Sequence, residues 1–148
     1  MRTPPRFEFY RAADSGPVAK WVADRIPGCT RGWDNFVSLR VFRGETIGGV
    51  VYHDWNPEHQ TMCMSAAGGD GWLTRPVLYA MHDYPFNQAG CQMVVLQTSE
   101  HNHVMRRIAK AYGYTETLIP RLRGRDEAEA ILTLTDDAWR SSRFHRKE

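Results

Sequence analysis

The sequence predicts an α/β fold, an α+β arrangement in which helices cover both faces of a mixed sheet. Two observations lead to this class. Three strand-like segments follow one another early in the chain, and a glycine-rich loop, a helix, an apolar strand and a second helix follow in the middle. Antiparallel strands joined to a crossover unit, which is right-handed in nearly all proteins, build a mixed sheet.

The first half of the chain is expected to contain one helix and three strands. Residues 14–26 place apolar side chains at helical spacing after a candidate N-cap, and Pro27-Gly28 ends that helix. Gly48-Gly49 within the second strand predicts a bulge or a close backbone approach. The first two strands should pair as a hairpin, and the three strands are expected at residues 36–42, 46–55 and 60–66.

The second half alternates helices with strands. A helix is expected over residues 74–88, kinked or shortened by Pro85, and a buried parallel strand over residues 92–98. Asn102 opens an amphipathic helix that Ser99 is also placed to cap, and Gly113 suits the left-handed position after it. The expected apolar face of this helix is Val104, Met105, Ile108, Ala111 and Tyr112. Two strands and a short helix should follow, at residues 114–119, 130–134 and 136–140.

The composition indicates a single folded domain, residues 1–148, in the cytoplasm. Hydrophobic residues make up 42% of the chain and aromatic residues 11%, which excludes a disordered protein. No apolar run approaches the ~20 residues that span a bilayer, and no apolar stretch of a signal peptide follows the first residues. Three widely spaced cysteines indicate reduced thiols rather than a disulfide framework.

Basic residues gather in two places although the net charge is only +2, which does not by itself indicate nucleic-acid binding. One group lies in residues 121–125 and the other in residues 140–147 near the C-terminus. A solvated chain end explains the second group, and a contact for an acidic partner or a phosphate is the alternative.

The glycine-rich loop after the third strand is a candidate anion site. Glycine lets backbone N–H groups approach a phosphate closely, and the N-terminus of the following helix adds a partial positive charge. The loop contains Gly68, Gly69 and Gly71. A plain surface turn is the alternative, because the carboxylate of Asp70 would repel a pyrophosphate and Pro76 lacks an N–H donor.

The order of these motifs resembles the GNAT (Gcn5-related N-acetyltransferase) superfamily over residues 7–139, most clearly from Met62 to Tyr114. That family has an Arg/Gln-x-x-Gly-x-Gly/Ala loop, a helix, an apolar strand and an Asn-led helix ending in Lys-x-Gly-Phe. The later motif runs here from Asn102 to Tyr114. In the loop, Gly71 matches the middle glycine, whereas Gly68 and Leu73 replace the first and last residues. Residues 72–75 and 84–91 resemble a divergent subgroup common among phage and prophage proteins.

The resemblance implies a GNAT-like, mostly antiparallel sheet in which the third long strand and the apolar strand splay apart. An acyl-CoA, most simply acetyl-CoA, would place its pantetheine arm in the gap and its pyrophosphate on the loop. Asn102 would lie near the pantetheine or shape the gap, and Arg106 would reach the nucleotide phosphates unless it forms a solvated helix face. The implied cofactor-binding residues are Met64, Ser65, Ala66, Gly68, Gly69, Gly71, Trp72, Leu73, Thr74, Asn102 and Arg106.

The implied reaction is direct N-acyl transfer, in which an amine attacks the thioester, a base takes a proton from the amine, and an acid protonates the leaving thiolate. Many family members place a Tyr as the acid seven residues after the Asn, where this chain has Ala109. Ser99, Tyr112 or water would stand in. The candidate bases lie just past strands: His53 beside Asp54, Glu100 and His101.

Several alternatives stay open at this point. The acceptor amine belongs to a protein side chain, a small molecule or, less favoured, a nucleic-acid base, and Trp33 and Trp55 are expected to line its pocket. His101 and His103 have no third ligand at a suitable spacing, so we expect no metal. The resemblance also allows a homodimer. Ala109 and the altered loop favour the alternative function, a catalytically degenerate GNAT-fold binding or regulatory module.

Overall fold

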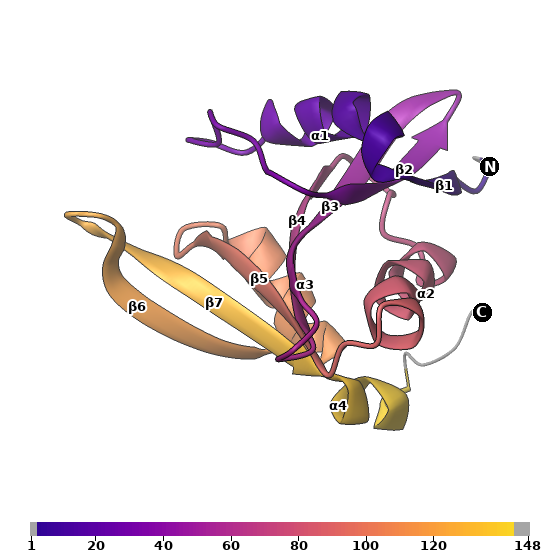
Figure 1. The fold of residues 1–148 in the computed structure, drawn as a ribbon. Coiled ribbons are helices and arrows are strands. Elements are labelled where there is room, and N and C mark those ends of the chain that lie inside the picture. Colours follow the sequence, from indigo (N-terminus) through magenta and orange to yellow (C-terminus); the bar gives the residue numbers. More distant parts are fainter. Residues whose placement is uncertain (1–2, 144–148) are drawn as a thin grey trace.

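The computed structural model describes residues 3–143, which form a seven-stranded mixed sheet with helices on both faces (Figure 1). The strand order is β1-β2-β3-β4-β5-β7-β6. β4 and β5 run parallel, and every other neighbouring pair is antiparallel. The predicted fold class is therefore confirmed. The strands are β1 (Arg6–Tyr10), β2 (Val37–Arg43), β3 (Glu45–Asn56), β4 (Thr61–Gly68), β5 (Met93–Ser99), β6 (Thr115–Gly124) and β7 (Glu127–Thr135).

The helices divide the core into two parts on opposite faces of the sheet. α1 (Gly16–Ala23) packs Val18, Ala19 and Val22 against Val51 of β3. The larger core lies on the other face and contains side chains from the three remaining α-helices, with α2 on the side opposite α1 in Figure 1. Those helices are α2 (Arg75–Asp83), α3 (His103–Tyr112) and α4 (Asp136–Ser141). None of the helices in residues 3–143 has the length and apolarity to cross a membrane.

Two short helical segments adjoin the α-helices. The 3₁₀ turn η1 (Ala12–Asp14) precedes α1, so the predicted helix starts later than residue 14 and ends at Ala23. α2 ends at Asp83 and continues as a π-helical segment, η2 (Tyr84–Gln88). Pro85 explains this break, because it has no N–H for the carbonyl of Met81 four residues earlier. The Tyr52 hydroxyl donates to that carbonyl instead, at 2.7 Å.

β1 was not predicted from the sequence. It pairs with β2 at the edge of the sheet, and its four residues from Arg6 to Phe9 are exposed, so neither face shows the one-sided burial of a typical strand. The predicted hairpin of β2 and β3 is confirmed.

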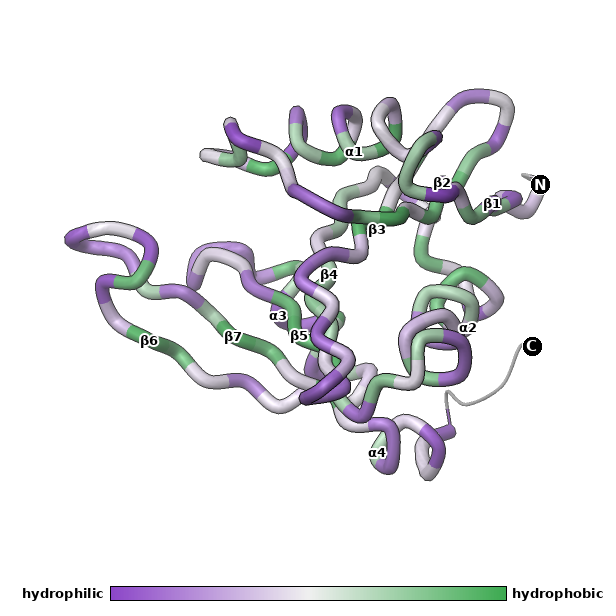
Figure 2. Tube along the Cα trace, viewed as in Figure 1, coloured by the Kyte–Doolittle hydropathy of each residue, from purple (hydrophilic) through white to green (hydrophobic). Residues whose placement is uncertain are grey.

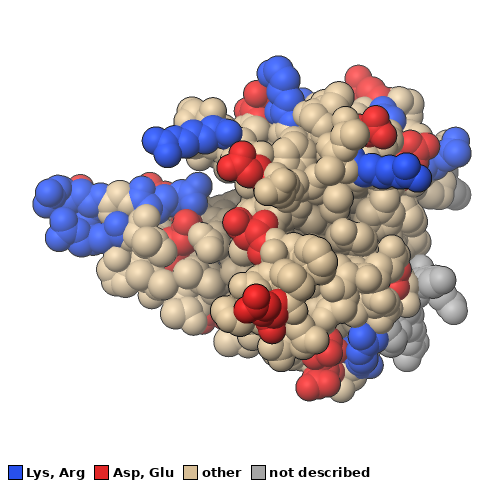
Figure 3. All heavy atoms as spheres, in the orientation of Figure 1, with Lys and Arg blue, Asp and Glu red and all other residues tan. Residues whose placement is uncertain are grey.

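The hairpin of β6 and β7 extends well beyond the predicted strands and projects from the sheet (Figure 1). Its pairing is irregular between Ile119 and Gly124, around Pro120 and the left-handed Arg121 (φ 66°). The tip is hydrophilic in Figure 2, and Figure 3 shows basic side chains gathered there. The arginines of this segment are Arg121, Arg123 and Arg125.

Candidate functional site

β4 and β5 separate halfway along their length. They pair from Thr61 with Met93 to Met64 with Leu96, and the pairing stops there. Beyond this point β4 stays paired with β3, and β5 stays paired with β7. The edges that face each other over residues 65–68 and 97–99 therefore lack strand partners and expose backbone N–H and C=O groups to a slot. The predicted splayed parallel pair is confirmed.

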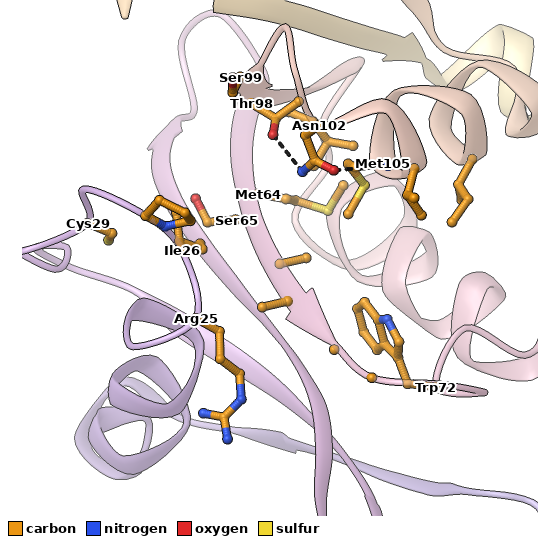
Figure 4. Close-up of a pocket in the computed structure, with 18 of the residues that line it drawn as sticks. Arg25, Ile26, Cys29, Met64, Ser65, Trp72, Thr98, Ser99, Asn102 and Met105 are labelled. Atoms are coloured by element: carbon orange, nitrogen blue, oxygen red, sulfur yellow. Dashed lines mark hydrogen bonds between the residues drawn. The ribbon is translucent and has the colours of Figure 1, made fainter.

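A pocket of about 1010 Å³ occupies this slot and reaches both faces of the sheet. In Figure 4, Met64 and Met105 lie on one side of β4, and Ser65 lies on the other side near Ile26 and Cys29. The wall on the α1 side contains Trp21, Arg25, Ile26, Pro27, Cys29 and Trp33. The wall on the α3 side contains His101, Asn102, Val104, Met105 and Ile108. Trp55, which was expected in the acceptor pocket, is exposed and is not part of either wall.

The loop after β4 is built around the Trp72 indole. A Cβ atom at Gly48 or Gly68, which are paired across β3 and β4, would lie 2.3 or 2.4 Å from that ring. This is the close approach predicted at Gly48-Gly49. The Gly69 N–H donates to the Ile47 carbonyl at 2.9 Å and is therefore already occupied.

The predicted cofactor residues of β4 and the loop divide into two groups. Those that line the pocket are Met64, Ser65, Ala66, Gly68, Gly69, Trp72 and Leu73. Gly71 and Thr74 do not line it. Thr74 is instead the N-cap of α2, because its hydroxyl accepts a hydrogen bond from the Val77 N–H at 3.4 Å.

Asn102 joins the end of β5 to the start of α3. Its Oδ1 accepts from the Met105 N–H at 3.3 Å, and its Nδ2 donates to Thr98 Oγ1 at 2.9 Å (Figure 4). Asn102 is thus the N-cap of α3, and the expectation that Ser99 is the cap is wrong. The Ser99 hydroxyl donates to the Glu127 carboxylate and accepts from the His101 N–H. Because its two hydrogen bonds join the end of β5 to the start of α3, Asn102 fixes the shape of this wall of the slot.

Arg106 has structural partners that keep it away from the pocket. Its guanidinium forms two hydrogen bonds with the Glu116 carboxylate, at 2.6 and 2.8 Å, and a third with the Glu100 carbonyl at 2.6 Å. These Arg106 hydrogen bonds lower the pKa of Glu116 to about 2. The expected contact of Arg106 with nucleotide phosphates is therefore replaced by an ion pair between α3 and β6.

His53 lies in a hydrogen-bonded chain with two neighbours. Its Nδ1 is 2.6 Å from Asp54 Oδ2, and its Nε2 is 2.8 Å from Ser65 Oγ. The Trp33 ring lies against the imidazole, with 5.6 Å between centroids. Among the predicted bases, His53 alone is hydrogen-bonded to a residue that lines the slot at the point where β4 and β5 part, namely Ser65.

The other catalytic candidates are placed less favourably. The Glu100 carboxylate accepts from the Ala128 N–H at 2.7 Å and does not line the pocket. His101 lines it, but two thirds of its side chain is exposed. The Tyr112 hydroxyl accepts from Trp139 Nε1 at 3.0 Å within the core, where burial raises the pKa of Tyr112 to about 12. Ser99 lines the pocket, with its hydroxyl committed to Glu127.

Several pocket residues were not identified from the sequence, among them Val104, Ile108, Arg25 and Arg43. Val104 and Ile108 of α3 were expected in the core, yet both are exposed and line the slot. Arg25 stacks on Trp21 at 3.6 Å, and the Arg43 guanidinium lies 3.7 Å from the position of a Cβ at Gly71. Only Ala109 and Tyr112 of α3 are buried, so its apolar face is wider than packing against the core requires. This excess of apolar residues was the signal in the sequence that the helix lines a site.

Within residues 3–143, His53, Asp54 and Cys63 bring three potential metal-ligand atoms within 4.8 Å of one another. Both imidazole nitrogens already have hydrogen-bond partners. Burial, and secondarily Asp54, raises the pKa of the Cys63 thiol, which favours the protonated form that does not bind metal. The group therefore fits a hydrogen-bond network better than a metal site.

Comparison with known proteins extends the fold assignment. No protein-family model and no curated protein sequence matches the chain. Among solved structures, a dodecameric spermidine N-acetyltransferase from Vibrio cholerae is similar with a TM-score of 0.69 and 12% identity, over 93% of this chain and 98% of that one. yncA from Salmonella typhimurium, described as an acetyltransferase and solved with its cofactor acetyl-CoA, gives 0.67 and 15%, over 90% and 94%.

Other acetyltransferase structures agree with these two. One gives a TM-score of 0.67 at 15% identity, over 94% of this chain and 87% of the other. In some further matches the chain covers only 62% or 63% of the solved protein. Likeness at such low identity establishes the architecture, and on this evidence the chain has the fold of the GNAT acetyltransferases.

Proposed function

We propose that this chain is an acyl-CoA-dependent N-acyltransferase, most simply an acetyltransferase, which passes the acyl group directly from CoA to an amine. The observation that carries the proposal is the slot between β4 and β5, with unpartnered strand edges over residues 65–68 and 97–99. A pantetheine arm has amide groups that can pair with such an edge, as an added strand would. The same slot connects the two faces of the sheet, so cofactor and acceptor can meet in it.

The α3 side of the pocket suits the cofactor. Val104, Met105 and Ile108 offer apolar surface to the arm, and the glycine loop leads from the slot toward Arg43. A guanidinium beside a glycine loop is a suitable partner for a pyrophosphate. We therefore place the phosphates near Gly68 to Leu73, with Arg43 in the role that Arg106 cannot fill.

The α1 side of the pocket suits the acceptor. Its wall contains two tryptophans and Arg25. Glu127, whose side chain shares the sheet face of Ser99, also lines the pocket but is paired with the Ser99 hydroxyl and with Arg123. A solved neighbour is a spermidine N-acetyltransferase, which points to small-molecule amines as acceptors. A polyamine carries extra positive charges that this wall does not balance, so we favour a small amine with an apolar or aromatic part.

The leaving group needs little help. A thiol has a pKa of about 8.5, so thiolate is a good leaving group near neutral pH and solvent can protonate it. The absence of a tyrosine at Ala109 is therefore compatible with catalysis. The alternative, a binding or regulatory module without catalysis, is favoured by the same Ala109 and by Asp70 in the loop.

Acetyl-CoA binding and turnover test the proposal. At a hundredfold excess over Kd, acetyl-CoA should stabilise the protein by about 2.7 kcal/mol and raise its Tm. Free-thiol release with 2-phenylethylamine should exceed that with spermidine. Binding without thiol release from any amine would support a cofactor-binding regulator instead. The absence of binding by calorimetry would exclude the transferase and favour a module with another ligand.

Gly71 offers a matched pair of variants. Gly71 has a left-handed backbone (φ 76°), which Asn and Asp tolerate similarly. Gly71→Asp would draw the Arg43 guanidinium away and repel phosphate, so it should weaken acetyl-CoA binding roughly tenfold more than Gly71→Asn, about 1.4 kcal/mol. Equal affinities in the two variants would contradict the loop assignment.

A further inference from the structure

We propose that Asp54, His53 and Ser65 form the proton relay of this acyl transfer, with Ser65 as the group that touches the attacking amine. The inference rests on the proposed function. Ser65 was expected only among the cofactor-binding residues, so its hydrogen bond with His53 is a finding of the structure.

The contacts have the order that a relay requires. Asp54 Oδ2 lies 2.6 Å from His53 Nδ1, and His53 Nε2 lies 2.8 Å from Ser65 Oγ. A carboxylate at Nδ1 favours the tautomer with hydrogen on that nitrogen, which leaves the lone pair of Nε2 facing the hydroxyl. Ser65 then donates to His53, and the oxygen of Ser65 remains able to accept a proton from a substrate.

The backbone at Asp54 makes the first contact feasible. Successive side chains of a strand normally point to opposite faces, so residues 53 and 54 should not meet. Asp54 has a left-handed conformation (φ 53°), and the pairing of β3 with β4 is irregular between His53 and Asn56. This local turn brings the carboxylate back onto the ring of the preceding residue.

Ser65 stands where the reacting atoms would be. It is the first residue of β4 after the last β4–β5 pair, Met64 with Leu96, and it lines the pocket. Figure 4 shows it on the side of β4 near Ile26 and Cys29, the proposed acceptor side. The arm lies on the α3 side in the proposed pose, so its thioester reaches Ser65 as it crosses the slot.

The surroundings of His53 suit a base that is shielded from bulk water. Its side chain is only 12% exposed, whereas that of Asp54 is 75% exposed. The groups that face it are Asp54 on β3, Cys63 and Ser65 on β4, and the ring of Trp33 from the loop after α1. Asp54 is the one carboxylate in this set, so it stabilises the imidazolium that forms.

The step balances as follows. The amine nitrogen forms a bond with the thioester carbon, and the C–S bond breaks to release CoA thiolate. The amine proton passes to Ser65 Oγ while the Ser65 hydroxyl proton passes to His53 Nε2. The imidazolium afterwards returns its proton to solvent or to the thiolate, so the products are an amide and CoA thiol.

The test compares His53→Gln, Asp54→Asn and Ser65→Ala with the intact protein, using acetyl-CoA and 2-phenylethylamine. His59→Gln, in the turn between β3 and β4 and outside the pocket, is the control. We expect kcat to fall about 100-fold or more for His53→Gln and roughly 10- to 100-fold for the other two, with KM for acetyl-CoA nearly unchanged. The limb of the kcat–pH profile that falls toward acid pH should vanish in His53→Gln and persist in His59→Gln.

Each variant is first checked for an intact acetyl-CoA-induced rise in Tm, which separates loss of chemistry from loss of fold. Without added amine, water takes its place, so slow thiol release by the intact protein should fall in the same three variants. Unchanged kcat and pH profile in His53→Gln would overturn the relay and leave the proposed function standing. Acetyl-CoA binding with no thiol release from amine or water would also overturn it. Failure to bind acetyl-CoA would remove the proposed function itself.

Two further outcomes would replace the relay with different chemistry. An acyl group found on Ser65 by intact-mass and peptide analysis would make Ser65 a nucleophile. Loss of turnover with EDTA and recovery with zinc would make His53, Asp54 and Cys63 a metal site. We expect neither acylated Ser65 nor sensitivity to EDTA.

Discussion

At the scale of single residues, the most informative buried group outside the pocket is His82. Its side chain is 1% exposed, its Nδ1–H donates to the Leu78 carbonyl at 2.8 Å, and its Nε2 accepts from the Tyr114 hydroxyl at 2.7 Å. The ring also stacks on Tyr112, with 4.6 Å between centroids. Both nitrogens of the neutral imidazole are thus satisfied, and a second proton, on Nε2, would require the Tyr114 hydroxyl to turn and accept instead of donate.

Because His82 is buried, we expect the folded protein to lose stability at mildly acid pH. Burial lowers its pKa from 6.5 to about 4 in the folded chain. Between these values the unfolded chain binds a proton that the folded chain does not, so stability falls as pH drops from 6.5 toward 4, by roughly 3 kcal/mol in all. Urea unfolding of the intact protein and of His82→Gln should differ in slope with pH over this window. The same pH dependence of stability in the intact protein and in His82→Gln would contradict this account. The control is His103→Gln, since His103 is exposed.

At the scale of elements, the junction of β5 and α3 carries the clearest prediction. Asn102→Ala removes the cap of α3 and the hydrogen bond to Thr98, so it should cost about 1 kcal/mol of stability and weaken acetyl-CoA binding. Asn102→Asp keeps the capping oxygen but has no N–H for Thr98. It should therefore retain stability in urea unfolding while calorimetry shows weaker binding. Affinity in Asn102→Asp equal to that of the intact protein would mean that the Thr98 link does not hold the slot.

The elements could largely be predicted from local sequence. The hairpin of β2 and β3, the buried β5, the helix opened by Asn102 and the left-handed Gly113 (φ 124°) all depend on neighbouring residues alone. β1 was missed although Phe7 and Phe9 alternate with Arg6 and Glu8, because the segment is only five residues long and its pairing with β2 depends on residues far along the chain. The end of α2 could not be predicted either. Pro85 leaves the Met81 carbonyl without a helical partner, and the hydroxyl of Tyr52, far away in the sequence, donates to this carbonyl.

The position of the candidate site could be predicted from the sequence, but the hydrogen-bond partners of its side chains could not. The slot follows from the order of the elements, but the Asp54–His53–Ser65 chain needs a strand register and a left-handed residue that the sequence does not reveal. A one-residue shift would turn Ser65 to the opposite face. The ion-pair partner of Arg106 was missed for a similar reason, since Glu116 lies on a later strand whose alignment with α3 only the structure shows.

At the scale of the whole molecule, the sheet consists of two halves joined by a short parallel contact. β1 to β4 form one half and β5 to β7 the other, and four residue pairs link β4 to β5. Beyond them the halves diverge, and α1 and the other helices cover opposite faces. The slot is thus the one interruption of the hydrogen-bonded sheet between β1 and β7 within the described residues, apart from local register shifts. A ligand that pairs with its edges would complete the sheet.

Hydrogen exchange should reveal this interruption and its filling. Within residues 65–68, the amides that point toward β3 are paired, whereas those that point into the slot have no strand partner and should exchange quickly. Acetyl-CoA should slow exchange in residues 65–68 and in the loop that follows, because the pantetheine arm would occupy those N–H groups. The centre of β2, far from the slot, should be unaffected and serves as an internal reference. Protection that appears elsewhere while residues 65–68 stay unchanged would show that the cofactor binds outside the slot, and the proposed mode of catalysis would then be wrong.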